Sequence, residues 1–99
     1  MHLIELNWLQ DMKKPNLKKL QSQADAGYAE AQYKVAEIYE KGKQVPRDIS
    51  EAHKWYTIAK ANGYDVDKFT INALEMFMTD EEKEHSKKLA QDWISSHKK

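Results

Sequence analysis

Hydrophobic and polar positions follow a helical period along almost the whole chain. Apolar residues recur at i, i+3 and i+4 spacings, and no segment shows the two-residue alternation of a half-buried strand. This pattern predicts six helices, which cover about residues 3–12, 15–26, 29–41, 48–63, 66–78 and 80–96. The sequence therefore predicts an all-α fold.

Proline and glycine separate the predicted helices. Pro15 ends the first helix, because proline lacks the amide hydrogen that would continue the hydrogen-bond ladder. Gly27, Gly42 and Gly63 each follow a helical segment, at the position where a left-handed residue commonly closes the last turn. We therefore expect positive φ angles at Gly42 and Gly63.

Two of the predicted helices begin at capping signals. Asp48 and Thr79 are each followed three residues later by a glutamate, Glu51 and Glu82, which is the spacing of a capping box. The helix after Asp48 has an apolar stripe that we expect to face the core, with Trp55 at its centre. The residues of this stripe are Ala52, Trp55, Tyr56 and Ala59.

The chain also repeats itself at a fixed interval. A shift of 36 residues aligns several similar pairs: Gly27 with Gly63, Tyr28 with Tyr64, Tyr33 with Phe69, Val35 with Ile71, and Ile38 with Leu74. A period of this size is typical of stacked helix pairs, in which each pair covers an apolar face of its neighbour.

The segment from Gly27 to Gly63 resembles one complete Sel-one-like repeat, a relative of the tetratricopeptide repeat. Val35 and Ala36 stand where that family usually has leucine and glycine. The family pattern is met by Gly27, Ala31, Gln32, Tyr39, Gly42, Val45, Asp48, Ala52, Trp55, Tyr56, Ala59 and Gly63.

The resemblance implies a short α-solenoid of antiparallel helix pairs within a single domain. We expect one full repeat, about residues 27–63, between two degenerate capping units. The N-terminal cap covers about residues 2–26 and the C-terminal cap about residues 64–97.

Composition argues against several other classes of protein. Sixteen basic and sixteen acidic residues balance to zero net charge, which gives no general attraction to nucleic acid or to anionic membranes. The chain has no cysteine, so disulfides and cysteine chemistry are excluded. No apolar run approaches the ~20 residues of a membrane-spanning helix, and the N-terminal segment does not resemble a secretory signal. We therefore expect a cytoplasmic protein.

The sequence shows no pattern of catalytic or metal-binding residues. His2, His53, His85 and His97 are not spaced as metal ligands, and we expect them to face solvent on charged helices. Glu82 and His85 form a single Glu-x-x-His, whereas di-iron bundles need two such motifs. No nucleophile elbow or phosphate-binding glycine cluster is present. We expect no enzyme activity, no metal and no cofactor.

The resemblance implies a non-catalytic protein–protein interaction module, an adaptor or an inhibitor, whose partner lies in a groove lined by the first helix of each repeat. Phe77 is either packed in the C-terminal cap or exposed as an aromatic anchor for that partner. The residues expected to line the groove are Glu30, Lys34, Glu37, Lys41, Thr70, Ala73 and Phe77.

Two alternative functions are also compatible with the sequence. Small members of the family are commonly bacterial, and some act as immunity proteins that block a toxin by covering its surface. Alternatively, the chain is a structural unit that self-associates through an open cap and so extends a solenoid. We expect a monomer, with a weak homodimer as the alternative, and the sequence leaves the identity of the partner open.

Overall fold

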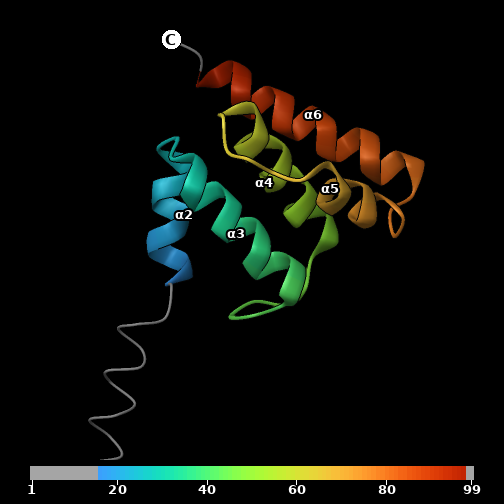
Figure 1. Ribbon diagram of the computed structural model, residues 1–99, viewed down its shortest axis with the longest axis horizontal. Helices are drawn as coiled ribbons and strands as arrows, with labels where there is room; N and C mark the ends of the chain where they lie inside the picture. Colours follow the sequence, from blue (N-terminus) through green and yellow to red (C-terminus); the bar gives the residue numbers. More distant parts are fainter. Residues whose placement is uncertain (1–15, 98–99) are drawn as a thin grey trace, which may run out of the picture.

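The computed structural model describes residues 16–97, and all regular structure in this range is helical. The helices follow one another as α2 (Leu17–Asp25), α3 (Ala29–Lys41), α4 (Ile49–Ala61), α5 (Lys68–Glu75) and α6 (Asp80–Ser96) (Figure 1). The helix expected over residues 3–12 lies outside the described residues. For the part of the chain that is described, the prediction of an all-α fold is confirmed.

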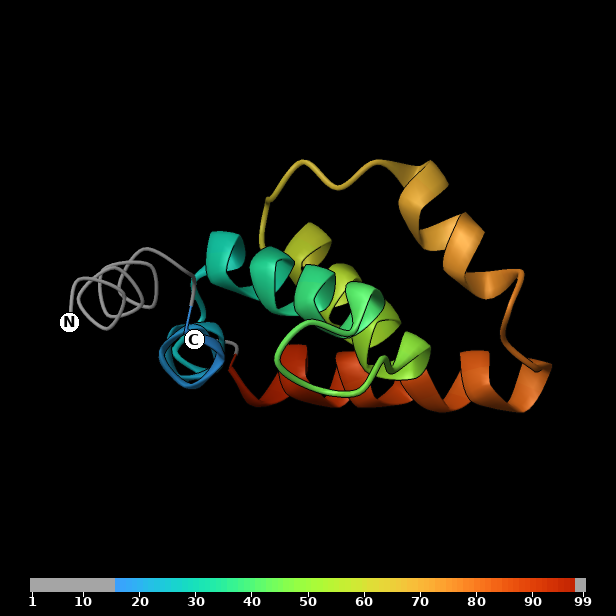
Figure 2. The ribbon, with the colours of Figure 1, turned by 90° about the horizontal axis from the view of Figure 1, so that it is seen from below.

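The helices stack as a short solenoid. α3 and α4 pack against each other at the centre, α2 covers α3, and α6 runs along α4 (Figure 1). α5 packs against α4 and stands apart from α3, on the side of the molecule opposite α6 (Figure 2). α4 is therefore surrounded by α3, α5 and α6, and it is the most buried helix of the described chain.

The core is centred on α4, as the sequence predicts. Trp55 is only 3% exposed, and its ring lies edge-on to Trp93 of α6 with the ring centroids 6.1 Å apart. The neighbouring Tyr56 points to the other side, where its ring meets Tyr33 of α3 at 5.3 Å. The two adjacent rings therefore link α4 to α6 on one side and to α3 on the other. The buried residues of α4 are Ala52, His53, Trp55, Tyr56, Ile58 and Ala59.

A buried glutamine adds a polar link between three segments. The Gln32 side chain is fully buried, and its Nε2 donates to the carbonyl of Ala24 at the end of α2 at 3.0 Å. Its Oε1 accepts a hydrogen bond from Asn62, which follows α4, at 2.9 Å. Because a buried amide without partners is costly, these bonds fix the register of α2 and α4 against α3.

The 36-residue repeat is visible in the way two helices end. Gly27 after α2 and Gly63 after α4 have positive φ angles of 105° and 94°. In both turns the amide of the following tyrosine, Tyr28 or Tyr64, donates to the carbonyl five residues earlier, at 3.1 Å and 3.0 Å respectively. This bond is the mark of a Schellman closure, so equivalent glycines of the repeat close equivalent turns.

Gly42 ends α3 with a φ of 70°, so positive φ is confirmed at both Gly42 and Gly63. The two positions differ in the space around them. A Cβ at Gly42 would lie 3.1 Å from the Cβ and 3.2 Å from the backbone nitrogen of Arg47, whereas a Cβ at Gly63 would meet nothing within 4 Å. Arg47 itself is held in place, because its side chain donates to the carbonyl of Glu40 at 2.8 Å.

We expect Gly42→Ala to lower the free energy of unfolding more than Gly63→Ala. Both substitutions place a side chain in the left-handed region, which costs about 1–2 kcal/mol. Only the change at Gly42 also presses a methyl group against Arg47. Urea unfolding of the two variants, followed by circular dichroism, measures the difference. Equal losses of stability would show that Arg47 and its loop move away from the added methyl group at no measurable cost.

α5 is shorter than the sequence predicts. The expected range was 66–78, whereas the helix covers Lys68–Glu75. Val66 is buried but lies before the helix, because the Asp67 side chain caps its first turn by accepting an amide hydrogen bond at 2.9 Å. After the helix, amides donate to carbonyls only three residues earlier, at 3.0 and 3.1 Å, and the chain turns tightly toward α6.

The two predicted capping boxes have different outcomes. At α6 both bonds form, since the Thr79 hydroxyl accepts from the Glu82 amide at 3.1 Å and the Glu82 carboxylate accepts from the Thr79 amide at 2.8 Å. At α4 the Asp48 side chain accepts from the Glu51 amide at 3.0 Å. The Glu51 carboxylate, however, pairs with Lys54 at 3.0 Å. α4 therefore has a cap without the reciprocal bond.

Candidate protein-interaction surface

The exposed face of α3 carries four charged side chains, here called the α3 patch. Glu30 and Lys34 pair at 3.3 Å, and Glu37 and Lys41 pair at 3.7 Å, both at i, i+4 spacing. At least 36% of each side chain is exposed. Exposed pairs of this kind stabilise a fold by only ~0–1 kcal/mol. The four charged groups therefore remain accessible to another molecule.

Two shallow hollows border the α3 patch. One, of about 380 Å³, lies between α2 and α3 and is lined by Leu20, Gln23, Tyr28, Ala29, Glu30, Ala31 and Lys34. The other, of about 240 Å³, lies beside the loop after α3 and is lined by Lys34, Glu37, Ile38, Lys41, Lys43 and Gln44. Lys34 belongs to both hollows, so the predicted residues of α3 form one continuous surface.

The residues predicted on α5 form a separate surface. Thr70 is half-buried, Ala73 is exposed, and Phe77, just after the helix, is 75% exposed. Neither hollow beside α3 is lined by these residues. The structure thus divides the predicted groove residues between the α3 patch and α5, which stand apart in Figure 2.

Three large apolar side chains are exposed around α5, and we call them the α5 apolar stripe. Phe69, Met76 and Phe77 are 69%, 85% and 75% exposed. Phe69 and Met76 are separated by seven residues, or two helical turns, so they lie on one side of the segment. The exposed Ala73 lies between them. Of the two possibilities open for Phe77, exposure is the one observed.

Phe69 is not among the residues predicted from the sequence to bind a partner, and the repeat explains why its ring is exposed. Its equivalent in the full repeat, Tyr33, is covered by the rings of Tyr56 and Tyr64 at 5.3 and 4.6 Å. A further shift of 36 residues from Tyr56 reaches Asp92, which offers no ring. Phe69 therefore keeps the aromatic character of its position but lacks a counterpart of the Tyr56 ring, which covers Tyr33.

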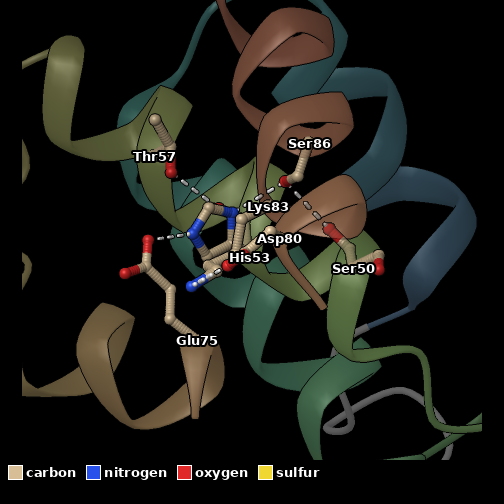
Figure 3. A network of polar contacts seen from close by, with 7 residues as sticks. All are labelled: Ser50, His53, Thr57, Glu75, Asp80, Lys83 and Ser86. Atoms are coloured by element: carbon tan, nitrogen blue, oxygen red, sulfur yellow. Dashed lines mark hydrogen bonds and ion pairs between the residues drawn. The ribbon is translucent and has the colours of Figure 1, made fainter. Parts of the chain in front are cut away.

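A buried polar network joins α4, α5 and α6 (Figure 3). His53 of α4 is 1% exposed, with Nδ1 2.7 Å from the Ser86 hydroxyl and Nε2 2.8 Å from a Glu75 carboxylate oxygen. The Ser86 hydroxyl also lies 3.3 Å from the Ser50 carbonyl. The expectation that the histidines face solvent is therefore wrong for His53. Its partners are 22 and 33 residues away, which local spacing does not reveal.

A serine, a histidine and a glutamate in contact resemble a hydrolytic triad, but their surroundings indicate a structural role. Ser86 is only 2% exposed, and neither hollow described above reaches His53 or Glu75. The hydrogen bond from His53 lowers the pKa of the Glu75 carboxyl, with Lys87 and Lys83 acting in the same direction against partial burial. The network keeps a carboxylate charged while it ties three helices together.

The other histidines of the described chain lie at the surface. His85 is exposed on α6, and His97 stacks on Trp93 with the ring centroids 3.7 Å apart. Between residues 16 and 97, no three or more histidine, aspartate or glutamate side chains are grouped so that they could hold a metal ion. No helix in this range is long and apolar enough to cross a membrane.

Antiparallel helix pairs with a 36-residue period and equivalent glycine closures define a helical-repeat protein of the tetratricopeptide-like class. Residues 29–64 match the Sel1 repeat, the family that the motifs of this segment resemble. This segment, which covers α3 and α4, is therefore a Sel1-like repeat. Sel1 repeats generally mediate protein–protein interactions and are typically non-catalytic. Among curated proteins, none matches the chain significantly.

Proposed function

We propose that this chain is a non-catalytic module that binds a protein partner through the α3 patch and through α5. The observation that carries the proposal is the α5 apolar stripe, which exposes two phenylalanines and a methionine on one short segment. Large contiguous apolar patches are rare on soluble monomeric proteins and often mark interaction sites. The proposed partner surface comprises Phe69 and Met76 of the stripe and the residues predicted from the sequence, which are Glu30, Lys34, Glu37, Lys41, Thr70, Ala73 and Phe77.

The two parts of this surface suit different tasks in binding. Aromatic side chains such as Phe77 are typical anchors, because they bury a large apolar area when a partner covers them. Charged groups such as those of the α3 patch contribute more to the selection of the partner and to the association rate. The polar network offers no competing account as an active site, because its serine and histidine are buried.

Photo-crosslinking tests the proposal in cells that produce the protein naturally. With p-benzoylphenylalanine in place of Phe77, we expect a discrete covalent adduct with one partner protein, which mass spectrometry then identifies. The matched control carries the same group in place of Asp92, an exposed residue of α6. Identical adducts from both positions, or none from Phe77, would contradict a partner site on α5. The identity of the adduct distinguishes an adaptor from a toxin-neutralising protein.

With the identified partner, Phe77→Ala is expected to weaken binding by ~2 kcal/mol, the range of an interface anchor. This loss corresponds to about a thirtyfold rise in Kd. The thermal unfolding curve should hardly move, since exposed substitutions usually change stability by less than ~0.5 kcal/mol. Isothermal titration calorimetry and differential scanning calorimetry measure the two quantities. A large loss of stability with unchanged affinity would place Phe77 in the packing of the cap instead.

A further inference from the structure

The α5 apolar stripe lies in a strongly acidic part of a chain that is neutral as a whole. We propose that it docks a basic amphipathic helix of the partner protein. This inference rests on the proposed function and adds the chemistry of the partner. The apolar side of the bound helix covers Phe69, Met76 and Phe77, and its lysine or arginine residues face the acidic groups before and after α5.

The geometry of the stripe suits a helix. Phe69 and Met76 are two turns apart, about 10 Å along the axis at ~1.5 Å per residue. The small Ala73 between them lets another backbone come close. Helices recognise grooves and ridges of this kind through apolar residues repeated at i, i+3, i+4 and i+7. α5 already packs on α4 with its opposite side, which carries the buried Leu74.

The charge around the stripe selects a basic partner. Residues 64–84 include seven acidic side chains and only two basic ones, although the whole chain has zero net charge. One of the basic groups, Lys83, lies 3.1 Å from Asp80 and is paired with it. The other, Lys68, lies 5.8 Å from the ring centroid of Phe69. The segment that carries the stripe therefore has five more acidic than basic side chains, and Lys68 is the one basic group beside a stripe residue that no acidic group pairs in the described range.

Part of this acidity has a structural explanation, and part has none. Asp67 caps α5, and Glu82 belongs to the capping box of α6. Asp65, Glu81 and Glu84 are exposed, and their side chains make no hydrogen bond or ion pair with other residues of the described range. Asp65 precedes α5 and Glu81 follows Phe77 by four residues, so unpaired carboxylates occur on both sides of the stripe in the chain.

Two synthetic peptides test the proposal with the full chain. One is an amphipathic helix of leucine and lysine, and the other has glutamate in place of every lysine. In fluorescence anisotropy at low salt, we expect the basic peptide to bind at least tenfold more tightly than the acidic one. Amide chemical shifts of the unmodified protein should change upon addition of the basic peptide chiefly in residues 68–81.

Variants distinguish the apolar and the charged contributions. Phe69→Ser with Phe77→Ser should weaken binding of the basic peptide at least tenfold. Asp65→Lys with Glu81→Lys should reverse the preference between the two peptides. A matched control, Asp25→Lys with Asp92→Lys, changes the net charge by the same amount at exposed positions on α2 and α6. This control should leave the preference for the basic peptide in place.

Each contrary result has a distinct meaning. If both peptides bind equally and both lose affinity in the phenylalanine variant, the basic partner is excluded, while protein binding by α5 stands. If the shift changes fall outside α5, the docking site is wrong, and the crosslink at Phe77 then decides the proposed function separately. If sedimentation velocity shows a dimer that the phenylalanine variant abolishes, a second copy of this chain is the occupant, and the proposal is overturned.

Discussion

Trp55→Ala is expected to lower the free energy of unfolding by about 3–5 kcal/mol, the usual loss for an aromatic residue removed from a core. Trp55 is 3% exposed, and its ring packs on Trp93 of α6. The Lys54 ammonium lies 5.0 Å from the centroid of the same ring. Truncation removes these contacts and leaves a cavity between α4 and α6. Since small domains are stabilised by only ~5–15 kcal/mol in total, much of the stability would be lost.

Urea unfolding followed by far-ultraviolet circular dichroism measures this loss. Trp55→Phe is the graded variant, because it keeps an aromatic ring and should lose clearly less stability than the alanine variant. Lys60→Ala, at an exposed position of the same helix, is the control for a change in α4 that does not touch the core. A soluble Trp55→Ala protein with an unchanged midpoint would contradict the placement of Trp55 at the α4–α6 contact.

The sequence predicts the helices and their order because those features depend on local patterns. Apolar spacing locates α3 and α4, and the glycine closures at Gly27 and Gly63 follow from conformational freedom at single residues. The α6 capping box likewise follows from two residues three apart. Dependence on local patterns also explains why the predicted start of α5, at residue 66, is wrong. Val66 is apolar and buried, but the cap at Asp67 excludes it from the helix.

The features that sequence analysis missed depend on contacts between distant segments. His53 looks like a surface residue on a charged helix until α5 and α6 bring Glu75 and Ser86 to its two ring nitrogens. Phe69 looks like a core position by its alignment with Tyr33, and only the packed structure shows that no ring between residues 16 and 97 covers it. Both cases involve side chains beyond the segment that matches the Sel1 repeat, Glu75 and Ser86 in the first and Phe69 in the second, so the family pattern does not specify these contacts.

The polar network leads to the second large effect. His53→Ala is expected to lower the free energy of unfolding by about 2–4 kcal/mol, which combines a cavity in place of the buried ring with the loss of two hydrogen bonds between helices. The Ser86 hydroxyl and the Glu75 carboxylate lose their hydrogen bonds to the ring, and α5 loses a tether to α4. His85→Ala is the matched control, since His85 is exposed on α6. Equal, small losses in both variants would contradict a structural role for the network.

The network also predicts how stability depends on pH. The pKa of Glu75 is lowered in the folded state, chiefly by the His53 hydrogen bond. The folded protein therefore binds fewer protons at this group than the unfolded chain, and stability falls as the pH decreases. The contribution of Glu75 to stability is fully present above the ordinary carboxyl pKa of 4.5. It is lost as the pH drops through the lower pKa that this group has in the folded state.

Glu75→Gln removes the titrating group while it keeps a side chain of the same shape. Below pH 4.5 we therefore expect the variant to lose less stability with falling pH than the unchanged protein. Thermal unfolding at a series of acidic pH values measures both slopes. Glu84→Gln, at an exposed position of α6, is the control and should retain the slope of the unchanged protein. Parallel slopes for the Glu75 variant and the unchanged protein would show that His53 does not hold this carboxylate in its charged form.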